Sequence, residues 1–460
     1  MTIDTATLTS LSALLGERFS TRAADRDHHA GQETHHLPQP PDAVAWPLTT
    51  DEVAAIIRIC VAAKIPVIAH GLGSSLEAHV AAVEGGVCID MMRMNKVLRV
   101  SPDDLDCTVE AGLTRLELNA ALRDTGLFFP VDPGANATVG GMCATRASGT
   151  SAVRYGTMAE NVLNLTVVTP QGEIIRTARR ARKSSAGYDL THLYIGSEGT
   201  LGIITEVTLR LHGRPESLVA AVCSFPGPEA ACRTAIEAIQ CGLNPGRMEY
   251  MDEGAIAAVN AFSHLSETVA DTLFVEFAGN PDEVGAQVEM FRTLAEANGC
   301  SGFRWARAEE ERNLLWKARH SGYNATLAQR PGARGWASDV CVPIGALAEC
   351  ISHSKQLLAA CPVPSVIMGH VGDGNFHVLF ALDPDSAEDA EIVARINTAM
   401  VEKALSLDGT CTGEHGVGLG KQKYLKTEHG PALEVMRRIK AALDPENLFN
   451  PGKILPPDES

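Results

Sequence analysis

The sequence predicts an α+β protein built from two domains. The chain has 460 residues, and because a single hydrophobic core stops growing at about 250–300 residues, two folding units are expected. From Trp46 to about Arg214, helix-like and strand-like segments alternate and glycine-rich turns are frequent, whereas residues 215–360 contain few such turns. These two patterns indicate a first α+β domain that ends near Arg214 and a second domain that follows it.

The first domain opens with a helix and a buried strand. Thr49 or Thr50 can cap a helix that begins near Glu52, because a threonine hydroxyl accepts a hydrogen bond from an amide of the first turn. The apolar stripe of this helix consists of Val53, Ile56, Ile57, Cys60 and Val61. Buried or β-rich segments follow at Pro66–Ala69, Gly86–Met91 and Thr108–Ala111.

Residues 1–40 are expected to form a lead-in, with a short helix followed by the polar run HHAGQETHHLPQPP. The histidines of this run are a possible metal site. We favour a solvated segment, because neither histidine pair lies in a helical or strand-like pattern.

The second domain also alternates strands and helices. Its strand-like segments are Leu218–Phe225 and Thr272–Phe277, and its helix-like segments are Pro228–Gln240 and Asp282–Ala297. We expect an antiparallel sheet covered by helices on one face. After Cys361 the chain is again rich in motifs.

The composition argues against several classes of protein. The formal charge is −17 with no long basic run, so nucleic acid is a poor partner, since phosphate binding needs a concentrated basic surface. Twelve cysteines occur without a C-x-x-C pair, which argues against iron–sulfur clusters and thiolate zinc sites. We expect no signal peptide, no transit peptide and no transmembrane segment, and therefore a cytoplasmic protein.

Three glycine clusters are candidates for binding phosphate groups. They are Pro66–Ser75, which contains GLGSS, then Pro130–Gly134 with Thr138–Met142, and Gly196–Gly202. Glycine lets backbone amides approach an anion closely, and neighbouring hydroxyls add neutral donors. None of the clusters is a G-x-G-x-x-G that opens a helix in a βαβ unit, so a nicotinamide-binding Rossmann domain is not predicted.

Two histidine-containing stretches near the end predict a metal site. Val366–Gly369 and Phe376–Phe380 are strand-like, and Gly-Asp-Gly between them favours a turn. Such a hairpin is expected to bring His370 and His377 to opposing positions at its mouth. Glu414, in GTCTGEHG, would supply a third ligand. Two imidazoles and a carboxylate suit Zn²⁺, Mn²⁺ or Co²⁺ with positions left open for a substrate.

The glycine clusters, in order and spacing, resemble the FAD-binding domain of the vanillyl-alcohol oxidase superfamily, the para-cresol methylhydroxylase (PCMH) type. The runs that carry the resemblance are PLTTDEV, GLGSS, PGANATVGGMCATRASGTSAVRYGTM and GSEGTLGIITEVTLRL. The resemblance implies a two-lobed FAD domain and FAD contacts at Gly71, Gly73, Ser74, Ser75, Pro133, Gly134, Thr138, Gly141, Ser148, Arg154, Gly199, Gly202, Ile204 and Asn450.

Two positions depart from the pattern of that superfamily. Leu72 replaces the usual third glycine, and His70 stands where arginine is common. Members that attach FAD through a histidine carry it at the position of Ser74, so we expect FAD to be bound non-covalently.

The histidine-containing stretches are similar to those of FAD-linked D-2-hydroxyacid dehydrogenases, from about Trp46 to Leu455. The runs SDVCVP, GHVGDGNFH, GTCTGEHGVGLGK and FNPGK match most closely the members that oxidise D-lactate with cytochrome c as acceptor. The similarity implies that His370, His377 and Glu414 bind a divalent metal ion, either Zn²⁺ or Mn²⁺. It also implies a general base at His415 and a substrate-binding arginine at Arg319, which would otherwise be a charge on a helix surface.

The resemblance also limits the substrate. Members that act on dicarboxylates carry a lysine where this chain has Ala337, which favours a small D-2-hydroxy monocarboxylate, D-lactate first. The electron acceptor is expected to be cytochrome c, a quinone or an electron-transfer flavoprotein, and a homodimer is possible.

Other functions remain open. The alternatives are a glycolate oxidase FAD subunit, a D-2-hydroxyglutarate dehydrogenase-like enzyme, an ether-lipid synthase of the same flavin fold and a non-catalytic electron-relay flavoprotein. The expected organisation is a lead-in at 1–40, the FAD-binding domain at 41–220, a cap or substrate domain with the metal site at 221–415, and a C-terminal segment at 416–460 that returns to the FAD domain.

Overall fold

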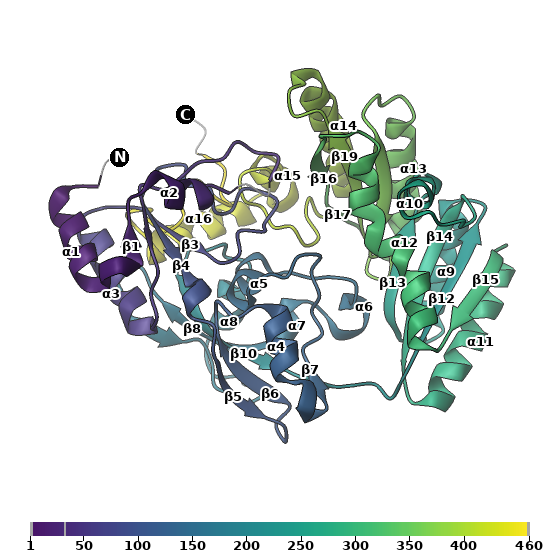
Figure 1. Cartoon of the computed structure of the whole chain (residues 1–460), viewed down its shortest axis with the longest axis horizontal. Helices are drawn as coiled ribbons and strands as arrows, with labels where there is room; N and C mark the ends of the chain where they lie inside the picture. The colour runs from purple at the N-terminus through teal and green to yellow at the C-terminus, as the bar shows by residue number, and fades with distance from the viewer. Residues whose placement is uncertain (1–2, 32–33, 458–460) are drawn as a thin grey trace. The chain divides into compact units, whose positions relative to one another are not determined.

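The computed structural model describes residues 3–31 and 34–457, and the chain divides into two units (Figure 1). Unit 1 consists of residues 1–148, 156–214 and 414–460, and unit 2 of residues 149–155 and 215–413. Seven terminal or lead-in positions of the expected domains, residues 1–2, 32–33 and 458–460, lie outside the described residues.

Unit 1 contains a four-stranded sheet in the order β1-β2-β4-β3. Its strands are β1 (Phe19–Ser20), β2 (Ala43–Ala45), β3 (Val67–His70) and β4 (Val87–Asp90). The last three are parallel, and α3 (Thr50–Ala62) connects β2 to β3. Thr49 caps α3 by accepting from the amide of Glu52, as predicted. The C-terminal part of the chain joins this sheet where Phe449 bridges to Val67, close to α16 (Ala432–Leu443) (Figure 1).

A second, antiparallel sheet of unit 1 has five strands in the order β5-β6-β10-β8-β9. They are β5 (Val97–Ser101), β6 (Asp106–Glu110), β8 (Val162–Val168), β9 (Ile174–Arg176) and β10 (Ile203–Arg210). A short pair joins β7 (Leu127–Phe128) to β11 (His212–Gly213). The helices of unit 1 not yet named are α1 (Thr5–Leu15), α2 (Ala23–His28), α4 (Arg115–Ala121), α5 (Val139–Thr145), α7 (Met158–Asn161), α8 (Leu190–Tyr194) and α15 (Leu425–His429).

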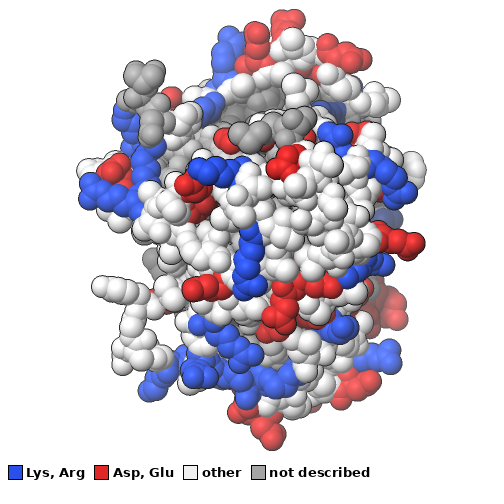
Figure 2. Space-filling view, turned by 90° about the vertical axis from the view of Figure 1, so that its left-hand side faces the viewer, with Lys and Arg blue, Asp and Glu red and all other residues white. Residues whose placement is uncertain are grey.

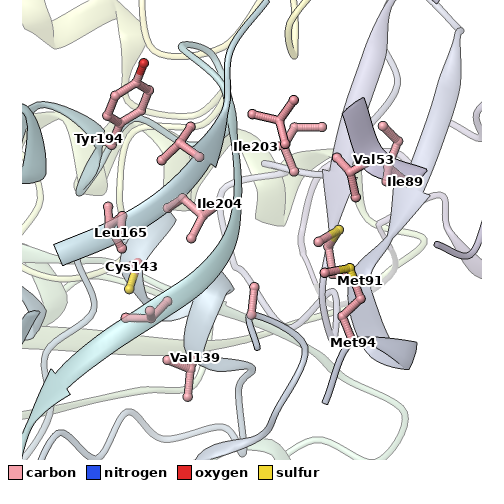
Figure 3. Close-up of a cluster of buried hydrophobic side chains, with 14 of the residues drawn as sticks. Val53, Ile89, Met91, Met94, Val139, Cys143, Leu165, Tyr194, Ile203 and Ile204 are labelled. Carbon is pink, nitrogen blue, oxygen red and sulfur yellow. The ribbon is translucent and has the colours of Figure 1, made fainter. Parts of the chain in front are cut away.

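One hydrophobic core joins the two sheets of unit 1. Figure 3 shows side chains from α3 and β4 facing those from α5, β8 and β10. The residues it labels are Val53, Ile89, Met91, Met94, Val139, Cys143, Leu165, Tyr194, Ile203 and Ile204, all buried. Because burial of each large apolar side chain contributes about 1.5–3 kcal/mol, this core ties both sheets into one unit.

Unit 2 is built on an antiparallel sheet of eight strands. The path runs β15-β12-β14-β13-β18-β19-β16, and β17 pairs with β19. The strands are β12 (Ser217–Phe225), β13 (Pro245–Met251), β14 (Asp271–Gly279), β15 (Ser301–Ala306), β16 (Arg334–Ala337), β17 (Val340–Cys341), β18 (Ser365–Gly369) and β19 (Asn375–Leu382).

Helices cover both faces of this sheet, so the expectation of helices on one face is wrong. On β12, Ala220 and Val222 pack with residues of α10 and α12, while the alternate residues Val219, Ala221 and Cys223 are equally buried. Helices α9 and α11 also contact β12. A strand buried on both faces is apolar throughout, as SLVAAVCSF is. The helices of unit 2 are α6 (Ala152–Tyr155), α9 (Pro228–Gln240), α10 (Glu253–Ser263), α11 (Pro281–Ala297), α12 (Glu309–Ala328), α13 (Leu347–Leu358) and α14 (Ala387–Ser406).

The lead-in segment is not uniformly solvated. His29 is only 3% exposed, and its Nε2 lies 2.9 Å from Asp90 Oδ2 at the end of β4. Its Nδ1 lies 2.6 Å from the carbonyl oxygen of Asp25. The prediction of a solvated segment is therefore wrong for His29, because a single long-range ion pair leaves no periodic trace in the sequence.

Both ring nitrogens of His29 face oxygen acceptors, which favours the imidazolium form. Burial alone lowers its pKa, but hydrogen bonds to Asp90 and Asp25 outweigh burial and leave the pKa raised. The ring of His70 lies 4.6 Å from that of His29, and burial, reinforced by the charge of His29, lowers the pKa of His70 to about 4. These residues form a buried His/Asp group. The separation of 2.9 Å between His29 Nε2 and Asp90 Oδ2 is that of an ordinary hydrogen bond.

Acidic and basic side chains are mixed on the face of the molecule in Figure 2. Lys and Arg gather at its lower edge, the height at which Figure 1 places β5 and β6. Beside the turn between β5 and β6, Arg180 pairs with Asp104 at 2.6 Å and with Asp106 at 3.0 Å, and Arg99 also pairs with Asp106. These ion pairs offset much of the local positive charge. No helix among residues 3–31 and 34–457 is both long and apolar enough to cross a bilayer.

Replacing His29 should weaken unit 1 in a pH-dependent way. Because the pKa of His29 is raised on folding, the stabilising contribution of its ion pair is complete below pH about 6.5 and is lost as pH rises through the raised pKa. His29→Asn should cost about 3 kcal/mol at pH 6 and less at pH 9. Urea unfolding at both pH values measures this difference. The exposed neighbour provides the control variant, His28→Asn, and an equal loss at both pH values would contradict the assignment.

Candidate active site

The glycine-rich loops predicted to hold a flavin lie together in unit 1. A Cβ on Gly71 would come within 2.2 Å of Thr138 Oγ1, so the first loop passes directly against the N-terminus of α5. A Cβ on Gly199 would lie 3.7 Å from a side chain of β3. Asn450 joins the same group, because its Nδ2 donates to the carbonyl of Glu198 at 2.7 Å. Four segments that are distant in the sequence therefore converge.

Buried hydroxyls in these loops fit a phosphate-containing ligand. Ser75 Oγ and Ser197 Oγ are buried, and neither has a hydrogen-bond partner within the described part of the chain. A buried unpaired hydroxyl costs about 1–3 kcal/mol, so both side chains call for an acceptor that the protein itself does not supply. The pyrophosphate of FAD is such an acceptor, and the loops therefore fit the predicted cofactor.

The other predicted flavin contacts lie on several segments of the chain. Gly73 and Ser74 belong to the first loop, and Gly202 directly precedes β10. Pro133 and Gly134 precede α5, and Gly141 lies within this helix. Ser148 is buried and is the last residue of the first segment of unit 1. Ile204 is 8% exposed and its side chain packs in the core (Figure 3). Arg154 lies in unit 2, where its Nη1 donates to the carbonyls of Asn244 and Ala278.

The segment that follows His415 is held by a buried carboxylate of unit 1. Glu198 Oε1 accepts from the amide of Val417 at 2.7 Å, and its Oε2 accepts from the amide of Gly418 at 2.9 Å. Glu198 adopts φ of 52°, a left-handed conformation that costs about 1–2 kcal/mol for a residue with a Cβ. His79 Nε2 lies 3.3 Å from the same carboxylate. Glu198 thus links the third glycine cluster to the segment that carries the predicted base.

In unit 2 the predicted hairpin is present as β18 and β19, but its register differs from expectation. Met368 pairs with His377, and the carbonyl of His370 accepts from the amide of Asn375 at 3.3 Å. The two histidines are therefore diagonal neighbours, and the prediction of directly opposing positions is wrong. The turn spans residues 371–374, and its length displaces the register. The imidazole rings still approach, with centroids 5.4 Å apart.

Both imidazoles have Nδ1 next to an oxygen acceptor. His370 Nδ1 lies 2.7 Å from Glu249 Oε1, and His377 Nδ1 lies 3.1 Å from the carbonyl oxygen of Ser338. A proton on each Nδ1 leaves the Nε2 lone pair for a metal ion, the arrangement typical of metal-binding histidines. Both histidines are buried, at 8% and 6% exposed. The pair therefore fits a divalent metal.

Arg319 is not a charge on a helix surface. It projects from α12 to the fully buried Glu249, with Nε at 2.9 Å and Nη2 at 2.8 Å from Glu249 Oε2. Its side chain is 15% exposed. The predicted substrate arginine and the predicted metal ligand His370 therefore share one carboxylate.

The chain reaches Glu414 through a tightly held segment of unit 2. Thr412 Oγ1 donates to Asp339 Oδ2 at 2.7 Å, and Asp339 Oδ1 lies 3.5 Å from His377 Nδ1. A Cβ on Gly413 would come within 2.1 Å of Asn375 Nδ2, so glycine is required for this passage. Glu414 and His415 are the next two residues and belong to unit 1.

Three residues of these sites were not singled out from the sequence. Glu249 is a lone carboxylate within the apolar strand run Met248–Met251. A charge in a buried strand indicates a paired or functional residue, and this was the signal in the sequence that could have identified Glu249. Asp339 and Glu198 lie inside the quoted runs SDVCVP and GSEGT, where neither carries a pattern that distinguishes an orienting residue from a ligand.

Known proteins match this chain over both of its halves. The family "FAD binding domain" matches residues 41–178, and "FAD linked oxidases, C-terminal domain" matches residues 214–454. A zebrafish (Danio rerio) protein named probable D-lactate dehydrogenase, mitochondrial, is 49% identical, over 95% of this chain and 89% of its own length. An Arabidopsis thaliana protein named D-lactate dehydrogenase [cytochrome], mitochondrial, is 45% identical, over 98% of this chain and 80% of its own length.

Among solved structures, p-cresol methylhydroxylase with bound substrate superposes with a TM-score of 0.79 at 16% identity, over 98% of this chain and 96% of its own. This likeness confirms the predicted PCMH-type fold and the two-part α+β architecture.

The relatives correct the predicted cellular location. Both are named as mitochondrial proteins, which contradicts the expectation of a cytoplasmic one. All twelve cysteines are free, but free thiols indicate only a reducing compartment and do not distinguish the cytosol from an organelle interior. The matches to both halves of the chain, and to relatives over nearly its whole length, show that the chain belongs to the family of FAD-linked oxidases.

Proposed function

We propose that this protein oxidises D-lactate to pyruvate with non-covalently bound FAD and a divalent metal ion. The observation that carries the proposal is the arrangement in unit 2 of two imidazoles whose Nδ1 atoms face oxygen acceptors, with a half-buried arginine beside them. A small 2-hydroxy carboxylate has the two functional groups that such a set recognises, a hydroxyl for the metal and a carboxylate for the guanidinium. The names of the relatives support D-lactate as the substrate.

The loops of unit 1 would hold the cofactor. Gly71 and Gly73 let the backbone approach the pyrophosphate, and the hydroxyls of Ser75 and Ser197 would donate to its oxygens. When bound, FAD supplies the oxidant that accepts a hydride at N5 from C2 of the substrate. Ser74 stands where a covalent histidine tether would be, so this chain offers no such tether at that position.

His370, His377 and Glu414 would hold the metal. Glu414 follows Thr412 by only two residues. Thr412 is hydrogen-bonded to Asp339, and the same Asp339 lies beside His377. When bound, a Zn²⁺ or Mn²⁺ ion supplies Lewis-acid polarisation of the substrate hydroxyl. Neutral imidazoles and one carboxylate leave such an ion with net positive charge for this task.

The remaining steps belong to protein side chains. His415 takes the proton from the C2 hydroxyl oxygen while hydride leaves C2, so that one hydride and one proton, two electrons and two protons in all, are removed and the 2-oxo acid forms. Arg319 binds the substrate carboxylate and orients C2. For the electron acceptor, the name of the Arabidopsis relative favours a cytochrome over a quinone or a flavoprotein.

The side chain at position 337 favours a monocarboxylate substrate. Ala337 pairs with Leu379 on β19, two positions beyond His377, so these three side chains share one face of the sheet. A lysine at position 337 would place a cation near the metal-binding imidazoles to bind a second carboxylate. Alanine supplies no such charge, which disfavours D-2-hydroxyglutarate.

D-Lactate should reduce the bound flavin. Under anaerobic conditions we expect D-lactate to bleach the flavin absorbance much faster than glycolate or D-2-hydroxyglutarate, because the relatives are named D-lactate dehydrogenases and Ala337 supplies no cation for a second carboxylate. Stopped-flow absorbance measures the three rates. Faster bleaching by glycolate would instead assign a glycolate oxidase subunit, and no bleaching by any substrate would indicate an electron-relay protein.

Removing the metal should abolish turnover and leave the flavin in place. Dialysis against EDTA should lower the rate with D-lactate at least about a hundredfold, since the hydroxyl loses its Lewis acid. Added Zn²⁺ or Mn²⁺ should restore the rate, and metal analysis should find close to one ion per chain. Full activity in protein shown to be free of metal would refute this part of the mechanism.

His415→Asn should retain FAD and lose catalysis. Loss of a general base lowers the rate by about 10²–10⁴-fold, and FAD content should be unchanged because the flavin loops are untouched. Flavin content and the D-lactate reduction rate are the measurements. His264→Asn is a matched control, because His264 has φ of 53° at the end of α10, a conformation that asparagine tolerates. Wild-type turnover by the His415 variant would exclude it as the base.

A further inference from the structure

The carboxylate of Glu249 lies between two groups that have separate roles in the proposed reaction. Oε1 accepts from His370 Nδ1 at 2.7 Å. Oε2 accepts from Arg319 Nε at 2.9 Å and lies 2.8 Å from Arg319 Nη2. Each oxygen therefore serves one partner, and all three residues belong to unit 2.

Backbone pairing, not a loop, sets the place of Glu249. On β13 and β18, Tyr250 pairs with Gly369 and Met251 pairs with Met368. Continuing this antiparallel register by one residue places Glu249 opposite His370. Arg319 reaches the same carboxylate from the middle of α12. A strand and a helix of the folded core thus fix the three positions.

The chemistry at this position requires a carboxylate. Glu249 is 0% exposed, and a buried carboxylate persists only when its charge is paired and its oxygens accept hydrogen bonds. Both partners of Glu249 are donors. A glutamine has one acceptor oxygen and one donor nitrogen, so it would leave either His370 or Arg319 facing another donor.

We propose that Glu249 is a positioning residue that couples the metal-binding imidazole to the substrate-binding guanidinium. This inference rests on the proposed function. Glu249 keeps the proton of His370 on Nδ1, so that Nε2 is available to the metal. It also engages the Nε–Nη2 edge of Arg319, which leaves the Nη1 end to meet the substrate carboxylate.

The coupling has an electrostatic consequence. A divalent ion and a guanidinium near one substrate repel each other, and the negative charge of Glu249 lies between His370 and Arg319 to offset that repulsion. Loss of this charge should therefore weaken metal binding and substrate binding together, although Glu249 is placed to contact neither ligand directly.

The test compares Glu249→Gln with the wild-type flavoprotein and with Glu276→Gln. Glu276 is a carboxylate on the neighbouring strand of the same sheet, 3.9 Å from Arg247, and is a matched control outside the site. For Glu249→Gln we expect the Zn²⁺ dissociation constant, measured by chelator competition, to rise about tenfold to a hundredfold. The KM for D-lactate should rise about tenfold, more than kcat falls, with FAD content unchanged. Glu276→Gln should leave both constants near wild type.

Glu249→Asp is a second variant in case the glutamine variant does not fold. It keeps the charge but is one methylene shorter and cannot reach both partners, so either the Zn²⁺ dissociation constant or the KM should rise severalfold. Folded variants that stay within about twofold of wild type in both constants would overturn the inference. A wild-type protein that neither binds Zn²⁺ nor oxidises D-lactate would instead refute the proposed function itself.

Discussion

The candidate chemistry depends on how the chain passes from unit 2 back to unit 1. On one side of the passage, Thr412 is hydrogen-bonded to Asp339, and Gly413 fits against Asn375 where no other residue could. On the other side, the carboxylate of Glu198 binds the next backbone amides of the chain, at positions 417 and 418. The intervening Glu414 and His415 therefore lie on a very short segment that is anchored at both ends. Such a segment loses little conformational entropy when its side chains bind a ligand.

Buried carboxylates orient several of the candidate groups within each unit. Asp339, Glu198 and Glu249 are each at most 5% exposed, and each accepts hydrogen bonds from donors that must be held in place. Replacing a buried ion pair by apolar residues of similar volume is often neutral or favourable for stability. Stability alone therefore does not explain why these three carboxylates are buried. Orientation does, because a carboxylate that accepts two hydrogen bonds defines both a direction and a tautomer. The site is thus held by electrostatic contacts that contribute specificity more than folding energy.

The sequence predicted the parts of the fold that leave a periodic or local trace. Helix α9 spans the predicted residues, and the two strands of the hairpin, the Thr49 cap and the glycine clusters were all anticipated. Several of the errors concern single contacts or registers that leave no periodic trace. The burial of His29 depends on Asp90, which is 61 positions away, and the diagonal placement of His370 and His377 depends on the length of one turn. Glu249 was missed for the same reason, because its partner His370 is 121 positions away in the chain.

The fold does not determine the reaction. p-Cresol methylhydroxylase shares the architecture at 16% identity while its name denotes a different substrate class. The glycine loops of unit 1 suit the FAD of the matched families, whereas the hairpin histidines, Arg319 and Ala337 of unit 2 would determine which substrate is oxidised. Strands β16 and β19 carry two of these positions on one face, and α12 supplies the arginine. A change of substrate among relatives should therefore involve few side chains of unit 2, while the cofactor loops stay as they are.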